Sequence, residues 1–182
     1  MEKRTSRFRK IDVCIWNDEK FHSLSPNGKL AFLYLITHPQ MTSLGAMRAS
    51  IEGLSCELGI DAEAFREVFR EGLAEAYSEA NCVYVKNFIF YQTPQSPNVV
   101  LAWKSSLDLI PECHLKTQAI QDAKALTEGL GEAFREAFAK AIGNKEKGER
   151  SKEKGKPAIY RGGKAKNAEV EQISRLFPGG TT

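Results

Sequence analysis

The chain has 182 residues, of which 42% are hydrophobic, and its formal net charge is +3. That length suffices for one domain with a sizeable core plus extensions, and no apolar run approaches the roughly 20 residues that a membrane helix needs. The N-terminus lacks the hydrophobic segment of a secretory signal, so we expect an intracellular protein that does not enter a membrane.

Basic charge is concentrated at the two ends of the sequence. Residues 11–143 carry 11 Lys or Arg against 17 Asp or Glu, whereas residues 144–182 carry 10 against 5. The N-terminal arm, residues 1–10, holds five basic residues: Lys3, Arg4, Arg7, Arg9 and Lys10. An acidic body with basic ends is typical of proteins whose arms bind a polyanion such as DNA. The alternative is that the basic tail only keeps itself soluble and disordered.

The first elements should be a short approach segment, a helix and a strand. Residues 11–21 are apolar enough to anchor the chain to a core, with four candidate anchors: Ile11, Val13, Ile15 and Trp16. Ser25 can cap a helix whose first residue is Pro26, and that helix should run to about Thr37. Residues 42–48 are expected to form a short strand.

A helix-turn-helix followed by two strands is predicted between residues 50 and 91. The first helix should end at Gly59, the second should begin after Asp61 and end at Gly72, and strands should cover residues 73–77 and 82–90. The shared core is apolar: Leu54, Leu58, Ile60, Phe65 and Val68. This order predicts a mainly α protein with a small β-sheet, built as a winged helix-turn-helix followed by helices and a disordered basic tail. A small helical bundle with a hairpin is the alternative.

The second helix of this unit would read bases if the protein binds DNA. Arg66 and Arg70 lie one turn apart and share a face, where arginine can pair with guanine edges. Three acidic residues share that surface and can neutralise the arginines: Glu63, Glu67 and Glu71. Arg48 and Lys86 complete the predicted DNA surface, while the strand turn at 78–81 has no Lys or Arg. An ordinary solvated face, or one that binds protein, remains open.

Further helices and a charged tail are expected after residue 93. Three apolar stripes predict three helices: Val99, Trp103 and Leu107; Leu115, Ala119, Ile120 and Ala123; Leu130, Phe134, Phe138 and Ala141. Such stripes more often pack in a core than bind a ligand. The Lys/Glu/Gly-rich stretch that follows should be disordered.

The last residues could form a short amphipathic peptide. Its apolar face contains Val170, Ile173, Leu176 and Phe177. A peptide of this kind on a flexible tether can fold on a partner, although it could equally dock on its own domain. We therefore divide the chain into a basic arm (1–10), a winged-helix domain (11–93), a helical extension (94–143), a disordered basic linker (144–167) and a tail peptide (168–182).

The sequence contains no arrangement typical of catalysis or metal binding. The four cysteines form no CxxC pair, and we expect free thiols, buried or half-buried, in a reducing cytosol: Cys14, Cys56, Cys82 and Cys113. The three histidines are scattered, and no phosphate-binding loop occurs. We therefore predict no catalytic residue, no metal and no cofactor, and a protein that is not an enzyme.

Several short motifs in order resemble a known group of proteins. They are Arg9–Asp12, Ile15–Asp18 with Phe21, Leu30–Leu35, Thr37–Pro39, Thr42–Gly45, Val83–Phe88, Tyr91–Gln92 and Ser96–Val100. Together they are similar to phage and prophage winged-helix proteins of the replisome-organiser and lambdoid origin-binding type.

That resemblance implies a DNA replication protein in the cytoplasm of a bacterial host. It implies binding to duplex DNA at an origin, self-association into a homo-oligomer through the winged domain, and recruitment of a helicase or primosome protein. Two other functions fit the residues: a winged-helix transcriptional regulator, which should read bases, and a protein-interaction module that has lost DNA binding, which the acidic body favours.

Overall fold

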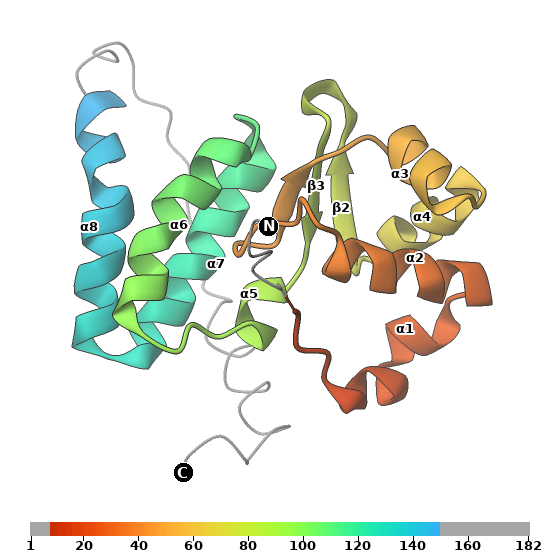
Figure 1. The fold of residues 1–182 in the computed structure, drawn as a ribbon, viewed down its shortest axis with the longest axis horizontal. Helices are drawn as coiled ribbons and strands as arrows, with labels where there is room; N and C mark the ends of the chain where they lie inside the picture. Colours follow the sequence, from red (N-terminus) through yellow and green to blue (C-terminus); the bar gives the residue numbers. More distant parts are fainter. Residues whose placement is uncertain (1–7, 150–182) are drawn as a thin grey trace, which may run out of the picture. The chain divides into compact units, whose positions relative to one another are not determined.

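The protein is mainly helical with one small antiparallel sheet, as the sequence predicts (Figure 1). The computed structural model describes residues 8–149. Its elements are η1 (Val13–Asn17), α1 (Glu19–Ser23), α2 (Pro26–Thr37), β1 (Ala46–Arg48), α3 (Ile51–Leu58), α4 (Ala62–Arg70), β2 (Ala74–Tyr77), η2 (Ser78–Ala80), β3 (Cys82–Val85), α5 (Phe88–Tyr91), α6 (Pro97–Leu109), α7 (His114–Leu130) and α8 (Glu132–Glu149).

Polar caps fix the starts of the first long helices at the predicted positions. The Ser25 hydroxyl accepts a hydrogen bond from the Gly28 backbone N–H at 3.0 Å, which satisfies a donor at the start of α2. Ser50 caps α3 in the same way, and the Asp61 carboxylate caps α4. The three expected helices are therefore confirmed, although the one that begins after Asp61 ends at Arg70 and not at Gly72.

The sheet has the strand order β1-β3-β2, so the last strand in sequence lies in the middle. Ala46 pairs with Tyr84 on one side of β3, and Glu75 pairs with Tyr84 on the other. All four residues of β3 are buried. Because successive side chains of a strand point to opposite faces, both faces of β3 must be covered by helices.

Two apolar cores cover the two faces of the sheet. Val83 and Val85 face the first core, which is built mainly from α1 to α4. Cys82 and Tyr84 face the second core, which is built mainly from α6 to α8. Figure 1 shows the sheet between these two groups of helices. The largest fully buried side chains come from both cores: Trp103, Tyr84, Phe21, Phe65, Leu35 and Met41 among them.

Buried polar contacts join the helical extension to the sheet. The Tyr84 hydroxyl donates a hydrogen bond to the Asp122 carboxylate of α7. Burial, together with this carboxylate, raises the pKa of Tyr84 well above its ordinary value, so the hydroxyl stays protonated. Gln118 donates to the same carboxylate at 2.9 Å. The described residues up to Gly148 accordingly belong to one compact unit.

The strand predicted over residues 82–90 is shorter than expected. It ends at Val85, where Ala74, the first residue of β2, is its last pairing partner. Asn87 then adopts a left-handed conformation with φ of +57°, and residues from Phe88 onward form the short helix α5. The Lys86 N–H still donates to the Leu73 carbonyl at 3.1 Å, and the left-handed turn at Asn87 then takes the chain out of the sheet. The first strand expected over 73–77 is confirmed from residue 74.

The N-terminal approach segment is anchored by other residues than those predicted. Val13 is 79% exposed and Trp16 is 60% exposed, so neither fills the core, whereas Phe21 and Leu24 are buried. Only Ile15 of the four expected anchors is packed against the first core. Residues 13–17 form a single 3-10 turn at the periphery, in which Ile15 is partly buried and the Trp16 ring meets Phe21 edge to face.

The three helices predicted for the extension are confirmed, with shifted ends. Leu130 closes α7 instead of beginning α8, because Gly131 breaks the helix with φ of +106°. Helix α8 runs to Glu149, into residues that the sequence assigns to a linker, since Lys and Glu are good helix formers. The remaining linker and the tail peptide lie outside the described residues. None of the helices in residues 8–149 is long and apolar enough to cross a membrane.

Candidate nucleic-acid interface

Helices α3 and α4 meet through a tight turn built on Gly59. Gly59 adopts the left-handed conformation, with φ of +73°, that glycine reaches at little cost. The Gly59 and Ile60 backbone N–H groups both donate to the Ser55 carbonyl, at 2.9 and 3.2 Å. Ser55 is buried, and its hydroxyl donates to the Ile51 carbonyl at 2.7 Å, so no polar group is left unpaired there. The turn therefore fixes the angle between the two helices.

The two arginines of α4 lie side by side, and both are paired with carboxylates. Arg70 Nη2 lies 2.5 Å from Glu63 Oε1, and Arg66 Nη1 lies 3.7 Å from Glu63 Oε2. Arg66 also faces Glu52 of α3, with 4.0 Å between Nη2 and Oε1. The side chains of Arg66 and Arg70 are 49% and 62% exposed. The arginines are thus accessible, but the surface around them carries no net positive charge.

Glu67 of α4 is hydrogen-bonded to the start of α2, and it acts on Arg70 only through a weaker electrostatic interaction. Its carboxylate accepts hydrogen bonds from the Ser25 backbone N–H at 2.8 Å and from the Ser25 hydroxyl at 2.6 Å. These bonds hold the pKa of Glu67 below its ordinary value. The contact fixes α4 against α2, so the position of α4 is set by polar as well as apolar packing.

The other two predicted contacts of the body lie at opposite ends of the central strand. Arg48 is exposed and pairs in register with Cys82, beside the turn between β2 and β3. Lys86 follows the other end of β3, and its ammonium lies 2.7 Å from Glu75 Oε1. Lys20 of α1, which the sequence analysis did not single out, approaches the same glycine as Lys86, Gly72 at the end of α4.

The described part of the basic arm is held against the body. Arg9 Nη2 donates to the Met41 carbonyl at 2.5 Å, and its guanidinium lies 5.3 Å from the centre of the Phe88 ring. The Gln92 side chain donates to the Lys10 carbonyl at 2.6 Å and accepts from the Lys10 backbone N–H at 3.3 Å. Arg9 therefore points inward, while the Lys10 side chain remains on the surface.

The remaining predicted contacts fall on residues that the structure does not describe. Three basic residues of the arm lie outside the described range: Lys3, Arg4 and Arg7. The four predicted partner-binding residues of the tail lie outside it as well: Val170, Ile173, Leu176 and Phe177.

A titratable cluster joins the end of α2 to α3. The His38 Nε2 and the Tyr34 hydroxyl lie 3.1 and 2.8 Å from the same Glu57 oxygen. These contacts lower the pKa of Glu57. The Gln40 backbone N–H donates to His38 Nδ1 at 3.1 Å, so the other ring nitrogen carries the proton that bonds Glu57 in the neutral ring. Both ring nitrogens of His38 are thus engaged in contacts within the fold.

The four thiols are in different surroundings. Cys14 and Cys56 are exposed, contrary to the expectation of buried or half-buried thiols, whereas Cys82 is buried and Cys113 is partly buried. Burial, with a hydrogen bond that the Cys82 thiol donates to Cys113, raises the pKa of Cys82 to about 12, which makes this thiol unreactive. Within residues 8–149 no group of three His, Cys, Asp or Glu side chains could hold a metal ion.

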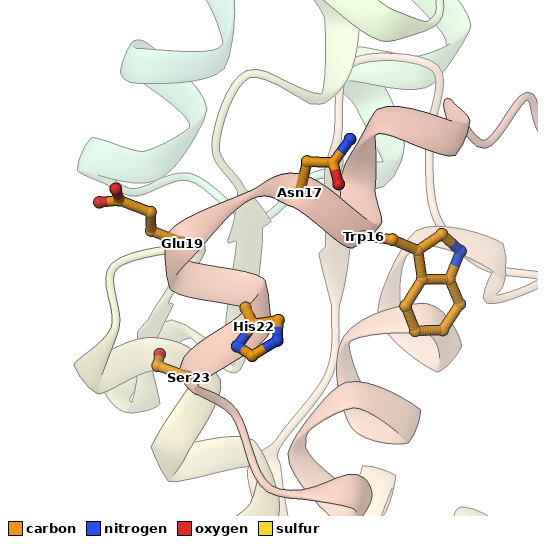
Figure 2. Close-up of a pocket in the computed structure, with 5 residues that line it drawn as sticks. All are labelled: Trp16, Asn17, Glu19, His22 and Ser23. Carbon is orange, nitrogen blue, oxygen red and sulfur yellow. The ribbon is translucent and has the colours of Figure 1, made fainter.

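The hollow beside Trp16 does not bring reactive groups together. It is lined by five residues of one continuous segment: Trp16, Asn17, Glu19, His22 and Ser23. Figure 2 shows the Trp16 and Glu19 side chains pointing away from one another, and the other three do not converge on a common point. The hollow offers an exposed indole ring for packing, and no arrangement of acid, base and nucleophile.

Sequence reasoning missed the contacts that cross between elements. The i,i+3 pair of Arg66 with Glu63 follows from helix spacing, but Glu52 comes from another helix and Ser25 from another part of the chain. The contact between Glu67 and Ser25 did leave a signal in the sequence, because Gly28, three residues after the Ser25 cap, leaves room for a side chain to approach.

Comparison of the chain with protein-family models, curated proteins and solved structures gave no match.

Proposed function

We propose that this protein is a winged-helix protein that binds duplex DNA and acts in phage-type DNA replication. The observation that carries the proposal is the order α2-β1-α3-α4-β2-β3 with the sheet order β1-β3-β2. A helix-turn-helix whose second helix is followed by a two-stranded hairpin is the arrangement that winged-helix proteins use to hold DNA. In it, α4 would enter the major groove.

The positions of the basic residues support α4 as the helix that reads bases. Arg66 and Arg70 stand one turn apart on its exposed side. Each could form a bidentate pair with guanine, an interaction worth about 1–3 kcal/mol of discrimination against another base. Arg48 lies beside the β2–β3 turn, where it could contact a phosphate, as could the exposed side chain of Lys10.

The helices that cover the two faces of the sheet could serve different roles. Helix α4 belongs to the first core, whereas α6 to α8 belong to the second core on the opposite face. A partner on the extension would therefore not cover α4. We propose, on the resemblance stated above, that the extension and the tail contact a helicase or primosome protein and that the winged domain self-associates.

Binding of fluorescent duplex DNA, followed by anisotropy over a range of salt concentrations, tests the DNA-binding proposal. We expect binding that weakens steeply with salt, because each phosphate contact releases counterions. Replacement of Arg66 and Arg70 by alanine should lower the ratio of specific to non-specific affinity. Arg135→Ala, which removes an exposed, ion-paired arginine from α8, is the matched control. Absence of binding at low salt would refute the proposal.

A second function, a protein-interaction module without DNA binding, is favoured by two specific observations. The carboxylates around Arg66 and Arg70 neutralise the helix that would face DNA. The N-terminal segment also exposes large apolar side chains, Val13 and Trp16, which suit a protein partner better than a phosphate backbone. Retention of bound host proteins by the wild type, together with no affinity for any duplex, would select this function.

A further inference from the structure

Among residues 8–149, Glu63 is the one residue that forms ion pairs with both arginines of α4, Arg66 and Arg70. Its two carboxylate oxygens are divided between them, with Oε1 at 2.5 Å from Arg70 and Oε2 at 3.7 Å from Arg66. The Asp61 cap holds the backbone of Glu63 at the start of the helix through a 2.7 Å hydrogen bond. The carboxylate is therefore positioned by its own helix and does not depend on a flexible loop.

The neighbouring acidic residues cannot take the same role. Glu67 is engaged by Ser25 through two hydrogen bonds. Glu52 reaches Arg66 only, and at the longer distance of 4.0 Å. Glu63 thus supplies the direct ion pair and the largest electrostatic contribution at Arg70, with smaller contributions from Glu67 and Glu71, and it shares Arg66 with Glu52.

The carboxylate of Glu63 affects two kinds of DNA contact differently. A phosphate is an anion, so it must displace Glu63 from the arginine and is also repelled by the carboxylate that remains nearby. A guanine edge is uncharged and offers two acceptors to one guanidinium, so it gains a bidentate pair without that repulsion. Glu63 should therefore weaken phosphate contacts more than guanine contacts.

We propose that Glu63 determines the sequence selectivity of α4 by holding Arg66 and Arg70 away from phosphates. The inference rests on the proposed DNA-binding function and adds a residue that sets the ratio between specific and non-specific binding. Its removal should produce a protein that binds DNA more tightly but discriminates less between sequences.

The test compares the full-length wild type with Glu63→Gln, which removes the charge and keeps the shape of the side chain. The matched control is Glu128→Gln, which removes the same charge from an exposed position on α7. The first probe is a short duplex of random sequence, titrated by anisotropy at several salt concentrations. The second is a pool of randomised duplexes, from which bound sequences are recovered and sequenced. Circular dichroism confirms that each variant is folded.

For Glu63→Gln we expect affinity for the random duplex to rise on the order of threefold to tenfold. The slope of the logarithm of affinity against the logarithm of salt concentration should become steeper by about 1 for each arginine freed to bind phosphate. The recovered sequences should lose guanine enrichment relative to the wild type, and Glu128→Gln should change neither quantity. An equal rise for both variants would overturn the inference, because total charge would then explain it. Wild-type binding that Glu63→Gln leaves unchanged would overturn this inference alone, whereas absence of binding by both proteins would overturn the proposed function as well.

Discussion

Replacement of Gly28 by alanine tests whether α4 is fixed to the start of α2 by Glu67. A Cβ atom added at Gly28 would lie 2.3 Å from Glu67 Oε2, too close for any real contact, and 3.2 Å from the Cβ of Leu24. The Glu67 oxygen cannot simply move away, because the carboxylate is held by two hydrogen bonds from Ser25. Alanine should therefore force Glu67 to give up these bonds.

The expected change in the free energy of unfolding for Gly28→Ala is the sum of two opposing effects. Alanine stabilises a helix by up to about 1 kcal/mol relative to glycine. Loss of two hydrogen bonds at a partly exposed site costs about 1 kcal/mol each. Gly28→Ala should then destabilise the wild type by about 1 kcal/mol. In a Glu67→Ala background the oxygen is absent, so the same substitution should be neutral or stabilising, and the coupling between the two sites should be about 2 kcal/mol.

Urea unfolding of the wild type, both single variants and the double variant measures this coupling as a double-mutant cycle. Since the pKa of Glu67 is lowered in the folded state, its contribution is present above the ordinary glutamate pKa of about 4.3 and is lost as the pH falls through the folded value. The coupling should accordingly shrink on acidification from neutral pH. An equal cost of Gly28→Ala in both backgrounds would refute the reasoning and would assign the strain to Leu24.

Two further predictions concern buried groups. Tyr84→Phe should lower the free energy of unfolding by about 1–2 kcal/mol, because it removes the hydrogen bond that joins β3 to Asp122. Urea unfolding measures this loss, and an unchanged free energy of unfolding would contradict the link between the sheet and the extension. A thiol reagent at mildly alkaline pH should modify Cys14 and Cys56 in the native protein but Cys82 only after unfolding, since burial raises the pKa of Cys82 to about 12. Peptide mapping by mass spectrometry identifies the labelled cysteines, and labelling of Cys82 in the native protein would count against its burial.

Much of the fold could be predicted because local signals agree with it. Ser25 with Pro26, Ser50 and Asp61 mark helix starts through side chains that satisfy the first backbone N–H groups, and Gly59 marks an end through its left-handed conformation. These signals depend only on near neighbours in sequence, so the helices between residues 26 and 70 were predicted close to their observed limits, whereas the strand expected over 42–48 is confined to 46–48.

The sequence predictions are wrong where the end of an element, the burial of a side chain or its partner depends on residues distant in the sequence. The run from Cys82 to Phe90 is apolar except for Lys86 and Asn87, but the strand ends at Val85, opposite the first residue of β2. Trp16 and Val13 look like core residues by type, yet the first core is already filled by Phe21, Leu24 and the helices that follow. The pairing of Glu67 with Ser25 joins residues that are 42 positions apart, which helix periodicity cannot reveal.

Under the proposed function, the charge arrangement of α4 assigns general DNA affinity and sequence selectivity to different parts of the chain. Glu63 and Glu52 offset the two arginines, so this surface adds little long-range attraction for a polyanion. General affinity would then have to come from basic residues nearer the chain ends, which the sequence concentrates there. Selectivity would come from α4, whose angle is fixed by Gly59 and by the Glu67 contact. Truncation of the ends and mutation of α4 should therefore change different quantities, the salt-dependent affinity in one case and the discrimination between sequences in the other.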